Sequence, residues 1–187
     1  MTGIEVSDIP GVRVIPSKKF VDARGFFNKI IDKKNLENED LQFDFDSVAL
    51  SSNYHSGTLR GLHFQSDPYA EEKIVACING SIFDVLVDLR VGSPTFSKWA
   101  AITLSAREPR VIFLPKGIAH GFQTLEDNSD LVYVLSAPYV ESHSKTLSYL
   151  DSDLGIKWPL PISNISKKDS SGLSLKNAIS FSSMFTK

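Results

Sequence analysis

Hydrophobic and polar residues alternate along this chain mainly with a period of two, in short runs that turn residues interrupt every eight to twelve positions. The runs are rich in β-branched and aromatic residues, which is typical of strands rather than helices. The pattern predicts ten strands, at residues 12–15, 25–31, 47–51, 58–65, 73–79, 81–89, 99–104, 110–114, 121–125 and 131–137. A polar stretch at residues 32–40 is a candidate for a short helix. The chain is therefore expected to be all-β.

Turn signals and strand number together predict how the strands are connected. Asn79 and Gly80 separate two predicted strands and favour a type I′ turn, because both residues tolerate positive φ, so we expect these strands to pair. Ten short strands in 187 residues favour a barrel or jelly roll over an open sheet, since closure removes exposed edges. After Asp151 the chain becomes irregular, and the prolines at 159 and 161 exclude a central strand there.

The predicted strand over residues 81–89 has one apolar face and one face that carries two acids. The apolar face consists of Phe83, Val85, Val87 and Leu89. Asp84 and Asp88 lie on the other face. Asp84 would either line the inside of the barrel and orient a basic partner, or lie on an edge strand with both acids in water. The alternation alone leaves both alternatives open.

Composition and charge narrow the class of protein. A hydrophobic content of 42% supports one domain with a full core over residues 1–187. The formal charge of −2, with scattered Lys and Arg, predicts no nucleic-acid partner. No apolar run approaches 18 residues, and residues 1–10 lack a signal-peptide pattern, so we expect no membrane association and a cytoplasmic location. Cys77, the single cysteine, lies in a strand pattern and is interpreted as inert packing.

The segment over residues 58–65 places charged chemistry in a strand that is otherwise apolar. Arg60 and His63 would lie on opposite faces of a regular strand. Gly61 between them suggests either a β-bulge or a ligand that approaches the backbone. If both side chains point into one cavity, the bulge is what redirects one of them. A lone strand histidine can equally be a satisfied core group.

Several segments, in order along nearly the whole chain, together form a recognisable pattern. They are DARGFF (22–27), RGLHFQ (60–65), KIV (73–75), FDVLVDLR (83–90), GSPTF (92–96), LPKGIAHGF (114–122), GIKWP (155–159) and SKKD (166–169), and Tyr133 belongs to the same pattern. With these segments the chain resembles the cupin-fold dTDP-4-dehydrorhamnose 3,5-epimerases and their nucleotide-sugar epimerase relatives. The resemblance implies a cupin-type jelly-roll β-barrel, with short helical and irregular segments in a C-terminal extension over about residues 151–187.

The resemblance also implies acid–base catalysis by four residues. Epimerisation beside a ketone needs a base, a group that stabilises the enolate, and an acid on the opposite face. His63 is implied as the base, because histidine ordinarily titrates near neutral pH, and Asp169 as its carboxylate partner. Lys73 is implied to stabilise the enolate and Tyr133 to act as the acid. From the residues alone, Asp169 would be a loop acid, Lys73 a surface ion pair with Glu71 or Glu72, and Tyr133 a buried phenol.

His120 follows a turn in the pattern of a second cupin motif, which raises the question of a metal. Metal-binding cupins usually supply a His-x-His pair, and Gln65 stands where the second histidine would be. Glutamine is a poor ligand for a first-row transition metal. We therefore predict no metal and no cofactor, and expect His120 to form a hydrogen-bonded support within the cavity, with Asp84 as a possible partner.

Substrate binding is expected from cationic and aromatic groups, because arginine and lysine suit the charges of a nucleoside diphosphate. Arg60 and Lys168 are the local candidates for the diphosphate. In the family, Arg24 and Phe27 belong to an N-terminal arm, here about residues 1–30, that reaches across a dimer interface into the partner's site. Tyr139 is expected near the nucleotide. The resemblance thus implies a homodimer that binds a nucleotide-diphospho-sugar.

The chain departs from the family pattern around the expected nucleotide and sugar rim. Val48 and Leu50 replace a glutamine and an asparagine, and Lys29 replaces a glutamate. Ser144 and Lys145 replace a glutamate and an arginine. Tyr139-Val140-Glu141 stands in place of Tyr-x-Pro. Loss of polar groups that pair with a base changes which ligands are discriminated. The sequence therefore supports the reaction type better than the identity of the nucleotide or the sugar.

The reading that accounts for most of these residues is inversion of C3 and C5 of a nucleotide-linked 4-keto-6-deoxy hexose. Three alternatives stay open: a C3-only epimerase, a sugar-binding cupin without catalysis, and a metal-dependent cupin enzyme. A pure binding protein has no need for an acid and a base on opposite faces of its ligand, so the four catalytic candidates together favour an enzyme.

Overall fold

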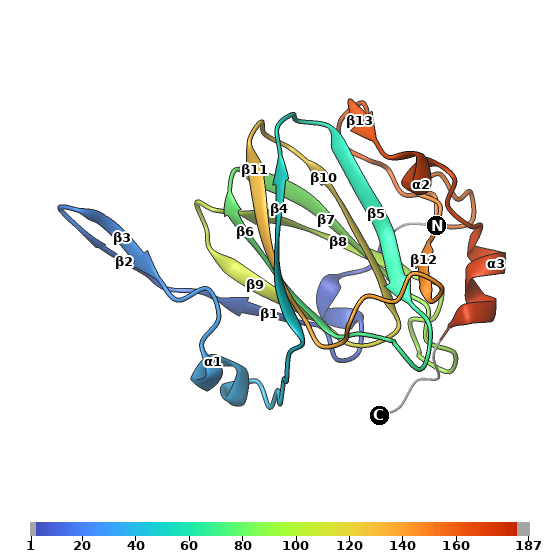
Figure 1. The fold of residues 1–187 in the computed structure, drawn as a ribbon, viewed down its shortest axis with the longest axis horizontal. Coiled ribbons are helices and arrows are strands. Elements are labelled where there is room, and N and C mark those ends of the chain that lie inside the picture. The colour runs from blue at the N-terminus through green and yellow to red at the C-terminus, as the bar shows by residue number, and fades with distance from the viewer. Residues whose placement is uncertain (1–2, 183–187) are drawn as a thin grey trace.

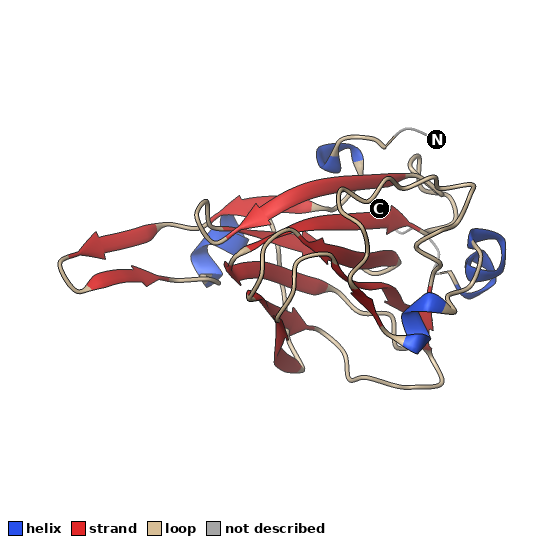
Figure 2. Ribbon diagram, turned by 90° about the horizontal axis from the view of Figure 1, so that it is seen from above, coloured by secondary structure: helices blue, strands red, loops and turns tan. Residues whose placement is uncertain are grey.

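The computed structural model describes residues 3–182, which form two β-sheets packed face to face (Figures 1 and 2). Residues 1–2, at the start of the predicted N-terminal arm, and residues 183–187, at the end of the predicted C-terminal extension, lie outside the described residues. The first sheet contains, in spatial order, β1 (Arg13–Pro16), β9 (Arg110–Leu114), β6 (Lys73–Asn79), β11 (Ser129–Leu135) and β4 (Ser47–Asn53). We call this sheet I.

Sheet II contains β12 (Ser144–Thr146), β5 (Thr58–Gln65), β10 (Ile118–Thr124), β7 (Ser81–Asp88) and β8 (Trp99–Ser105), and β13 (Asn164–Ile165) also pairs with β5. The strand pairings are antiparallel except that of β13 with β5. The remaining elements are the hairpin β2 (Lys19–Asp22) and β3 (Gly25–Asn28), the helices α1 (Lys33–Asn38), α2 (Lys167–Ser170) and α3 (Leu175–Ala178), and the 3₁₀ turns η1 (Val6–Asp8) and η2 (Ile179–Phe181). The expected all-β, cupin-type jelly roll is confirmed.

Side chains that alternate inward on both sheets fill one end of the space between them. From sheet I these are Val75, Cys77, Ile112, Leu114 and Leu131, and from sheet II Ile82, Leu86, Leu104, Ile118 and Phe122. Each is almost fully buried. Burial of an aliphatic or aromatic side chain contributes roughly 1.5–3 kcal/mol, so this layer stabilises the pairing of the sheets. The other end of the same space carries the polar residues of the site.

The outer faces of the sheets are covered by different segments. Outward residues of β7, among them Val85 and Val87, pack against Leu154, Leu175 and other residues of the C-terminal segment. Figure 1 shows this segment, with α2, α3 and β13, beside β5 and β12. On sheet I, the outward Ile74 packs in a cluster with residues of α1 and the loop that follows it. In the described residues, no helix is long and apolar enough to cross a membrane.

The β2–β3 hairpin projects away from the barrel (Figures 1 and 2). Large apolar side chains gather in the open on this hairpin: Phe20, Val21, Phe26 and Phe27 are between 52% and 76% exposed. Contiguous exposed apolar groups of this kind mark interaction surfaces more often than isolated ones do. Sequence analysis placed β3 within a longer strand and did not find β2.

The expectation that the strands on either side of Asn79-Gly80 pair with each other is wrong. β6 belongs to sheet I and β7 to sheet II, so the turn is a corner at which the chain changes sheets. Only Gly80 has a positive φ, of 69°, and a Cβ there would lie 2.4 Å from Ser129 Oγ. The preference of this dipeptide for tight turns was identified correctly, but turn chemistry does not specify which sheet the next strand joins.

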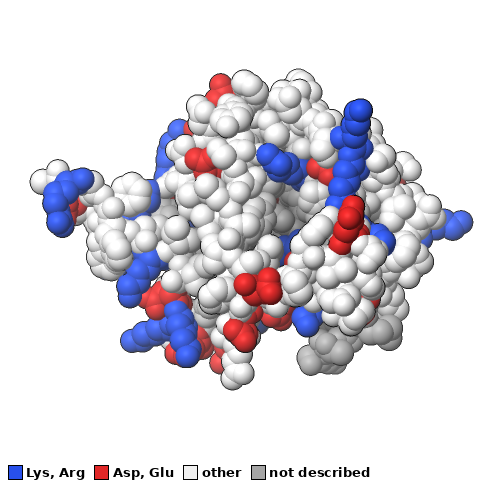
Figure 3. Space-filling model, viewed as in Figure 1, with Lys and Arg blue, Asp and Glu red and all other residues white. Residues whose placement is uncertain are grey.

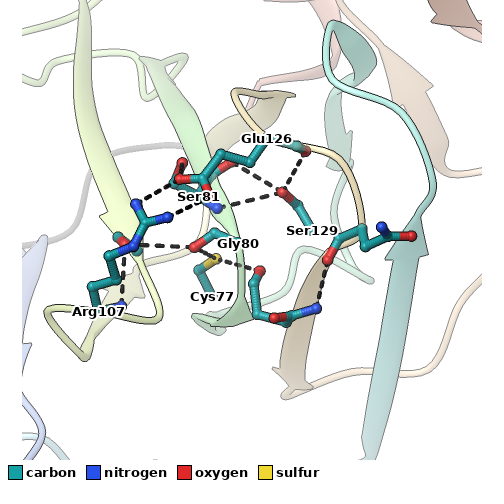
Figure 4. A network of polar contacts seen from close by, with 9 residues as sticks. Cys77, Gly80, Ser81, Arg107, Glu126 and Ser129 are labelled. Atoms are coloured by element: carbon teal, nitrogen blue, oxygen red, sulfur yellow. Dashed lines mark hydrogen bonds and ion pairs between the residues drawn. The ribbon is translucent and has the colours of Figure 1, made fainter.

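A polar network fixes this corner (Figure 4). Glu126 accepts hydrogen bonds from Ser81 Oγ at 2.6 Å and from Arg107 at 2.9 and 2.8 Å. Ser129 Oγ donates to the backbone oxygens of Glu126 and Ser81. The thiol of Cys77 contacts the carbonyl of Gly80 at the base of the corner. These contacts join the turn at Asn79-Gly80 to the turns that contain Arg107 and Glu126.

Candidate active site

The two sheets enclose a pocket of about 350 Å³ that borders the packed layer at Phe122. Its wall is contributed by β4, β6 and β11 of sheet I and by β5 and β10 of sheet II. It includes seven of the predicted site residues: Arg60, His63, Lys73, His120, Tyr133, Tyr139 and Lys168. Residues distant in sequence thus converge here.

A bulge in β5 places Arg60 and His63 on the same side. His63 pairs with His120 of β10, and Arg60 pairs with Phe122, so three steps along β5 match two along β10. Gly61 supplies the extra residue, with φ 109°. A Cβ at Gly61 would lie 2.6 Å from Gly121 Cα, so backbone approach requires glycine here. The predicted bulge is confirmed, and the close neighbour is β10 rather than a ligand.

His63 forms a close pair with Asp169. Its Nε2 lies 2.6 Å from Asp169 Oδ1, and the other carboxylate oxygen accepts a 3.2 Å hydrogen bond from Gly61 N–H. With Nε2 bonded to a carboxylate, Nδ1 is the ring nitrogen left to accept a proton. The His63 side chain is 39% exposed whereas that of Asp169 is 5% exposed. The imidazole can therefore reach a ligand while its carboxylate partner cannot.

The C-terminal segment delivers Asp169 to β5 from more than a hundred positions away. β13 pairs with Thr58 and Leu59, and Ser166 then caps α2 by accepting the N–H of Asp169 at 3.0 Å. Burial acts to raise the pKa of the Asp169 carboxyl, but the hydrogen bond and electrostatic interaction with His63 and the hydrogen bond from the N–H of Gly61 outweigh it, so the pKa lies below its ordinary value. Asp169 is thus ionised at neutral pH.

A second histidine–aspartate pair lies deeper in the barrel. His120 Nε2 is 2.7 Å from Asp84 Oδ1, and the two side chains are 3% and 0% exposed. Asp84 therefore faces the barrel interior and orients a basic partner, which decides between the two alternatives left open by the sequence. The His120 ring also meets Tyr133 edge on, with ring centroids 5.9 Å apart. His120 is a support beneath the pocket, as predicted.

Tyr133 enters the pocket from sheet I, on the opposite wall to His63. Burial and the nearby charge of Asp84 raise the pKa of the phenol well above its ordinary value, against a smaller opposite influence of Arg60. The hydroxyl accordingly keeps its proton at physiological pH. A neutral phenol facing an imidazole across a cavity can donate a proton to a ligand that the imidazole has deprotonated.

Lys73 lines the pocket, as the family resemblance implied, and is also paired with Glu71, as the residues alone suggested. The pair is buried, however, and not on the surface. The ammonium nitrogen lies 3.1 Å from Glu71 Oε1, with side-chain exposures of 8% and 10%. It also donates to the backbone oxygen of His63 at 3.4 Å. Sequence analysis treated Glu71 only as a surface partner. Its place two residues before an inward strand position was the signal that could have found it.

Lys168 and Tyr139 meet at the rim of the pocket. The Lys168 ammonium lies 5.6 Å from the centroid of the Tyr139 ring and donates to Ser144 Oγ at 3.1 Å. Tyr139 is 66% exposed, and the equally exposed Leu50 lines the pocket nearby. Across the opening, Arg60 Nε donates to Asn53 Oδ1 at 2.7 Å. The cations of Arg60 and Lys168 therefore flank the mouth of the pocket, where they would stabilise an anionic ligand.

Arg24 and Phe27 are not part of this pocket within one chain. Both belong to the projecting hairpin, where Arg24 pairs with Asp22, and Phe27 is 63% exposed. Lys and Arg elsewhere on the face seen in Figure 3 are scattered rather than gathered into a stripe. Any contact of Arg24 or Phe27 with a ligand in this type of site would require a second copy of the chain.

The contacts of Asp88 and Cys77 indicate structural rather than catalytic roles. Asp88, which is fully buried, accepts hydrogen bonds from Arg90, Ser93 and Thr95 in a turn after β7. Burial raises the pKa of the Cys77 thiol to about 11. A thiol that stays protonated is a poor nucleophile, which agrees with its interpretation as packing.

Gln65 fills the position of a second metal-binding histidine with protein contacts. Its amide nitrogen donates to the backbone oxygens of Tyr69 and Pro138, and its oxygen accepts from Val140 N–H at 2.8 Å. Over residues 3–182, His, Cys, Asp and Glu side chains form no group of three or more that could hold a metal ion.

The barrel is that of the cupin-fold epimerase class. In its pocket an imidazole–carboxylate pair on one wall faces a protonated phenol on the other, an arrangement suited to acid–base chemistry. Comparison with known families makes this specific. The family model for dTDP-4-dehydrorhamnose 3,5-epimerase matches residues 6–177, and the chain belongs to this family of isomerases.

Individual relatives agree with this assignment. The dTDP-4-dehydrorhamnose 3,5-epimerase of Sinorhizobium fredii is 41% identical over 170 residues, which cover 89% of this chain and 86% of the relative. The Legionella pneumophila enzyme, solved in complex with dTDP-4-keto-L-rhamnose, superposes with a TM-score of 0.89 at 32% identity, covering 99% and 97% of the two chains. A 3'-monoepimerase from Streptomyces bikiniensis, in complex with dTDP-quinovose, gives 0.85 at 27% identity, covering 98% and 93%.

Proposed function

We propose that this protein inverts C3 and C5 of a dTDP-linked 4-keto-6-deoxy hexose by metal-independent acid–base catalysis. The observation that carries the proposal is the placement of His63 and Tyr133 on opposite sheets with one pocket between them. Inversion requires removal of a proton from one face of a carbon and return of a proton to the other. Opposed donor and acceptor groups meet this requirement without rotation of the sugar.

The steps follow from the contacts of each group. Nδ1 of His63 takes the proton from the carbon beside the ketone, while Asp169 stabilises the imidazolium that forms. The electron pair moves into the carbonyl, and the ammonium of Lys73 stabilises the oxygen as negative charge develops. Tyr133 then returns a proton from the opposite face. Through the pocket mouth, solvent reprotonates Tyr133 and accepts the proton held by His63, which restores both groups. The raised pKa of the phenol ensures that the proton is present before reaction.

The nucleotide is assigned to the rim of the pocket. Arg60 and Lys168 flank the mouth and suit the two phosphates, and Tyr139 offers an aromatic face. The β2–β3 hairpin would extend into the site of a partner subunit, bringing Arg24 and Phe27 to the nucleotide there. The exposed phenylalanines of the hairpin support a homodimer, because burial of that surface would stabilise association.

Epimerisation at C3 alone is the second candidate. The structural relative named as a 3'-monoepimerase shares this fold, so the barrel does not determine how many centres are inverted. The apolar Leu50 at the pocket wall, where the family has a polar residue, favours altered discrimination among ligands.

The test is incubation with a panel of nucleotide-linked 4-keto-6-deoxy hexoses in deuterated water, followed by NMR. Deuterium at C3 and C5 with inversion at both is the expected result. Deuterium at C3 alone supports the second candidate. Tight dTDP binding without any exchange would contradict both and indicate a binding protein. The Tyr133→Phe variant should retain slow exchange but lose inversion, since the base remains and the opposing acid does not.

A further inference from the structure

A buried carboxylate in the pocket wall has no role in the steps above. Glu71 is 3.1 Å from the Lys73 ammonium, and both side chains line the pocket. A negative charge beside a site where an enolate forms would oppose the developing charge if it acted on the substrate alone. A carboxylate at this position is therefore compatible with the proposed reaction when its effect on Lys73 outweighs the repulsion.

Gln65 fixes the orientation of Glu71. The amide nitrogen of Gln65 lies 3.3 Å from Glu71 Oε2, and the same side chain is bonded to backbone groups of Tyr69, Pro138 and Val140. Gln65 is 5% exposed, so it cannot rotate into water to replace these bonds. The carboxylate of Glu71 is thus held at both oxygens, one by an anchored amide and the other by the ammonium.

Glu71 in turn restricts Lys73. An ammonium on a flexible four-carbon stem has three N–H donors and no geometric preference of its own. One donor faces Glu71 Oε1 and a second faces the backbone oxygen of His63. Within residues 3–182 these two oxygens are the acceptors of the Lys73 nitrogen, so one donor is left for a ligand in the pocket. Two fixed acceptors determine where that donor lies.

We infer that Glu71, anchored by Gln65, is a positioning residue that holds the ammonium of Lys73 at the ketone oxygen of the substrate. The inference rests on the proposed function, because it assigns Lys73 to the enolate. Gln65 occupies the position at which metal-binding cupins supply a histidine ligand. In this barrel Gln65 instead orients the carboxylate of Glu71, which positions the ammonium of Lys73 as the electrophile.

The experiment compares three variants of the full-length protein. Glu71→Ala removes both the charge and the acceptor, Glu71→Gln retains an acceptor oxygen at the same reach, and Glu72→Gln is a matched control. Glu72 lies next to Glu71 in sequence but does not line the pocket. Turnover and KM are measured with a dTDP-linked 4-keto-6-deoxy hexose, dTDP affinity by calorimetry, and stability by thermal melting.

We expect Glu71→Ala to lower kcat on the order of 10²-fold, because a misplaced catalytic group loses about that much, while KM and dTDP affinity stay within about threefold. Glu71→Gln should recover most of the lost kcat, and Glu72→Gln should match the wild type. The inference is overturned if Glu71→Ala keeps wild-type kcat, if Glu71→Gln is no better than Glu71→Ala, or if kcat, dTDP affinity and melting temperature fall together. An inactive wild-type protein would instead contradict the proposed function.

Discussion

Two histidine–aspartate pairs of nearly equal geometry lie side by side in this barrel. His63 with Asp169 and His120 with Asp84 have contact distances of 2.6 and 2.7 Å, and the two histidines are direct partners on β5 and β10. They differ in access: the His63 side chain is 39% exposed and that of His120 is 3% exposed. Exposure therefore distinguishes the two pairs, and in the proposed mechanism the more exposed His63 is the one that exchanges a proton with a ligand.

The strongest test of this contrast is removal of the accessible imidazole. His63→Asn should reduce deuterium exchange by about 10²–10⁴-fold, the usual contribution of a general base, with dTDP affinity nearly intact. His55→Asn, at an exposed histidine outside the pocket, is the matched control and should be fully active. Normal exchange by His63→Asn would exclude His63 as the base.

The next largest effect is expected from the partner of the accessible imidazole. Asp169→Asn keeps the shape of the side chain but loses the charge that stabilises the imidazolium, so kcat should fall on the order of 10²-fold. KM should change little, because Asp169 is buried behind His63. Steady-state kinetics measure both. A loss confined to KM would indicate that Asp169 contacts the substrate directly.

The buried pair should show the opposite balance. His120→Ala leaves the buried carboxyl group of Asp84 without its hydrogen-bond partner, and an unsatisfied buried polar group costs about 1–3 kcal/mol. The expected loss in kcat is only on the order of tenfold, through the displaced Tyr133 ring. Urea unfolding and kinetics on the same preparation separate the two effects. If His120→Ala lost activity as completely as His63→Asn while keeping its stability, the distinction between the pairs would fail.

The smallest effect concerns acid stability. Because the folded pKa of Asp169 lies below its unfolded value near 3.9, its contribution to stability is fully present above that value and is lost as pH falls through the folded pKa. The free energy of unfolding of the wild type should therefore exceed that of Asp169→Asn above the unfolded pKa, and the two should converge as pH falls through the lowered folded pKa. Urea unfolding across this range measures the difference. Parallel curves at all pH values would contradict it.

The sequence predicted the elements whose signals are local. β5, β6 and β9 begin and end at the predicted residues, because period-two alternation and flanking turns define strands without reference to their neighbours. β12 and β13 were not found, since they are only three and two residues long and depend on pairing with β5. The Asn79-Gly80 corner shows the same limit, because a turn signal carries no information about sheet membership.

The site was predictable in proportion to how locally it is encoded. The bulge that brings Arg60 and His63 together could be read from Gly61 between them. The pairing of His63 with Asp169 could not, because no periodicity links residues so far apart, and only resemblance to a family indicated it. The contact of Gln65 with Glu71 depends on side-chain rotamers and on the loop at Pro138, which neither pattern nor resemblance describes.

The docking of the C-terminal segment on β5 separates two events in the life of the chain. Every strand of sheet I and the long strands of sheet II precede residue 136, so the barrel can assemble during synthesis before α2 has left the ribosome. His63 receives its carboxylate only when Asp169 arrives with that late segment. In the proposed mechanism, a nascent or truncated chain that ends before Asp169 would therefore hold His63 without the carboxylate that stabilises its imidazolium.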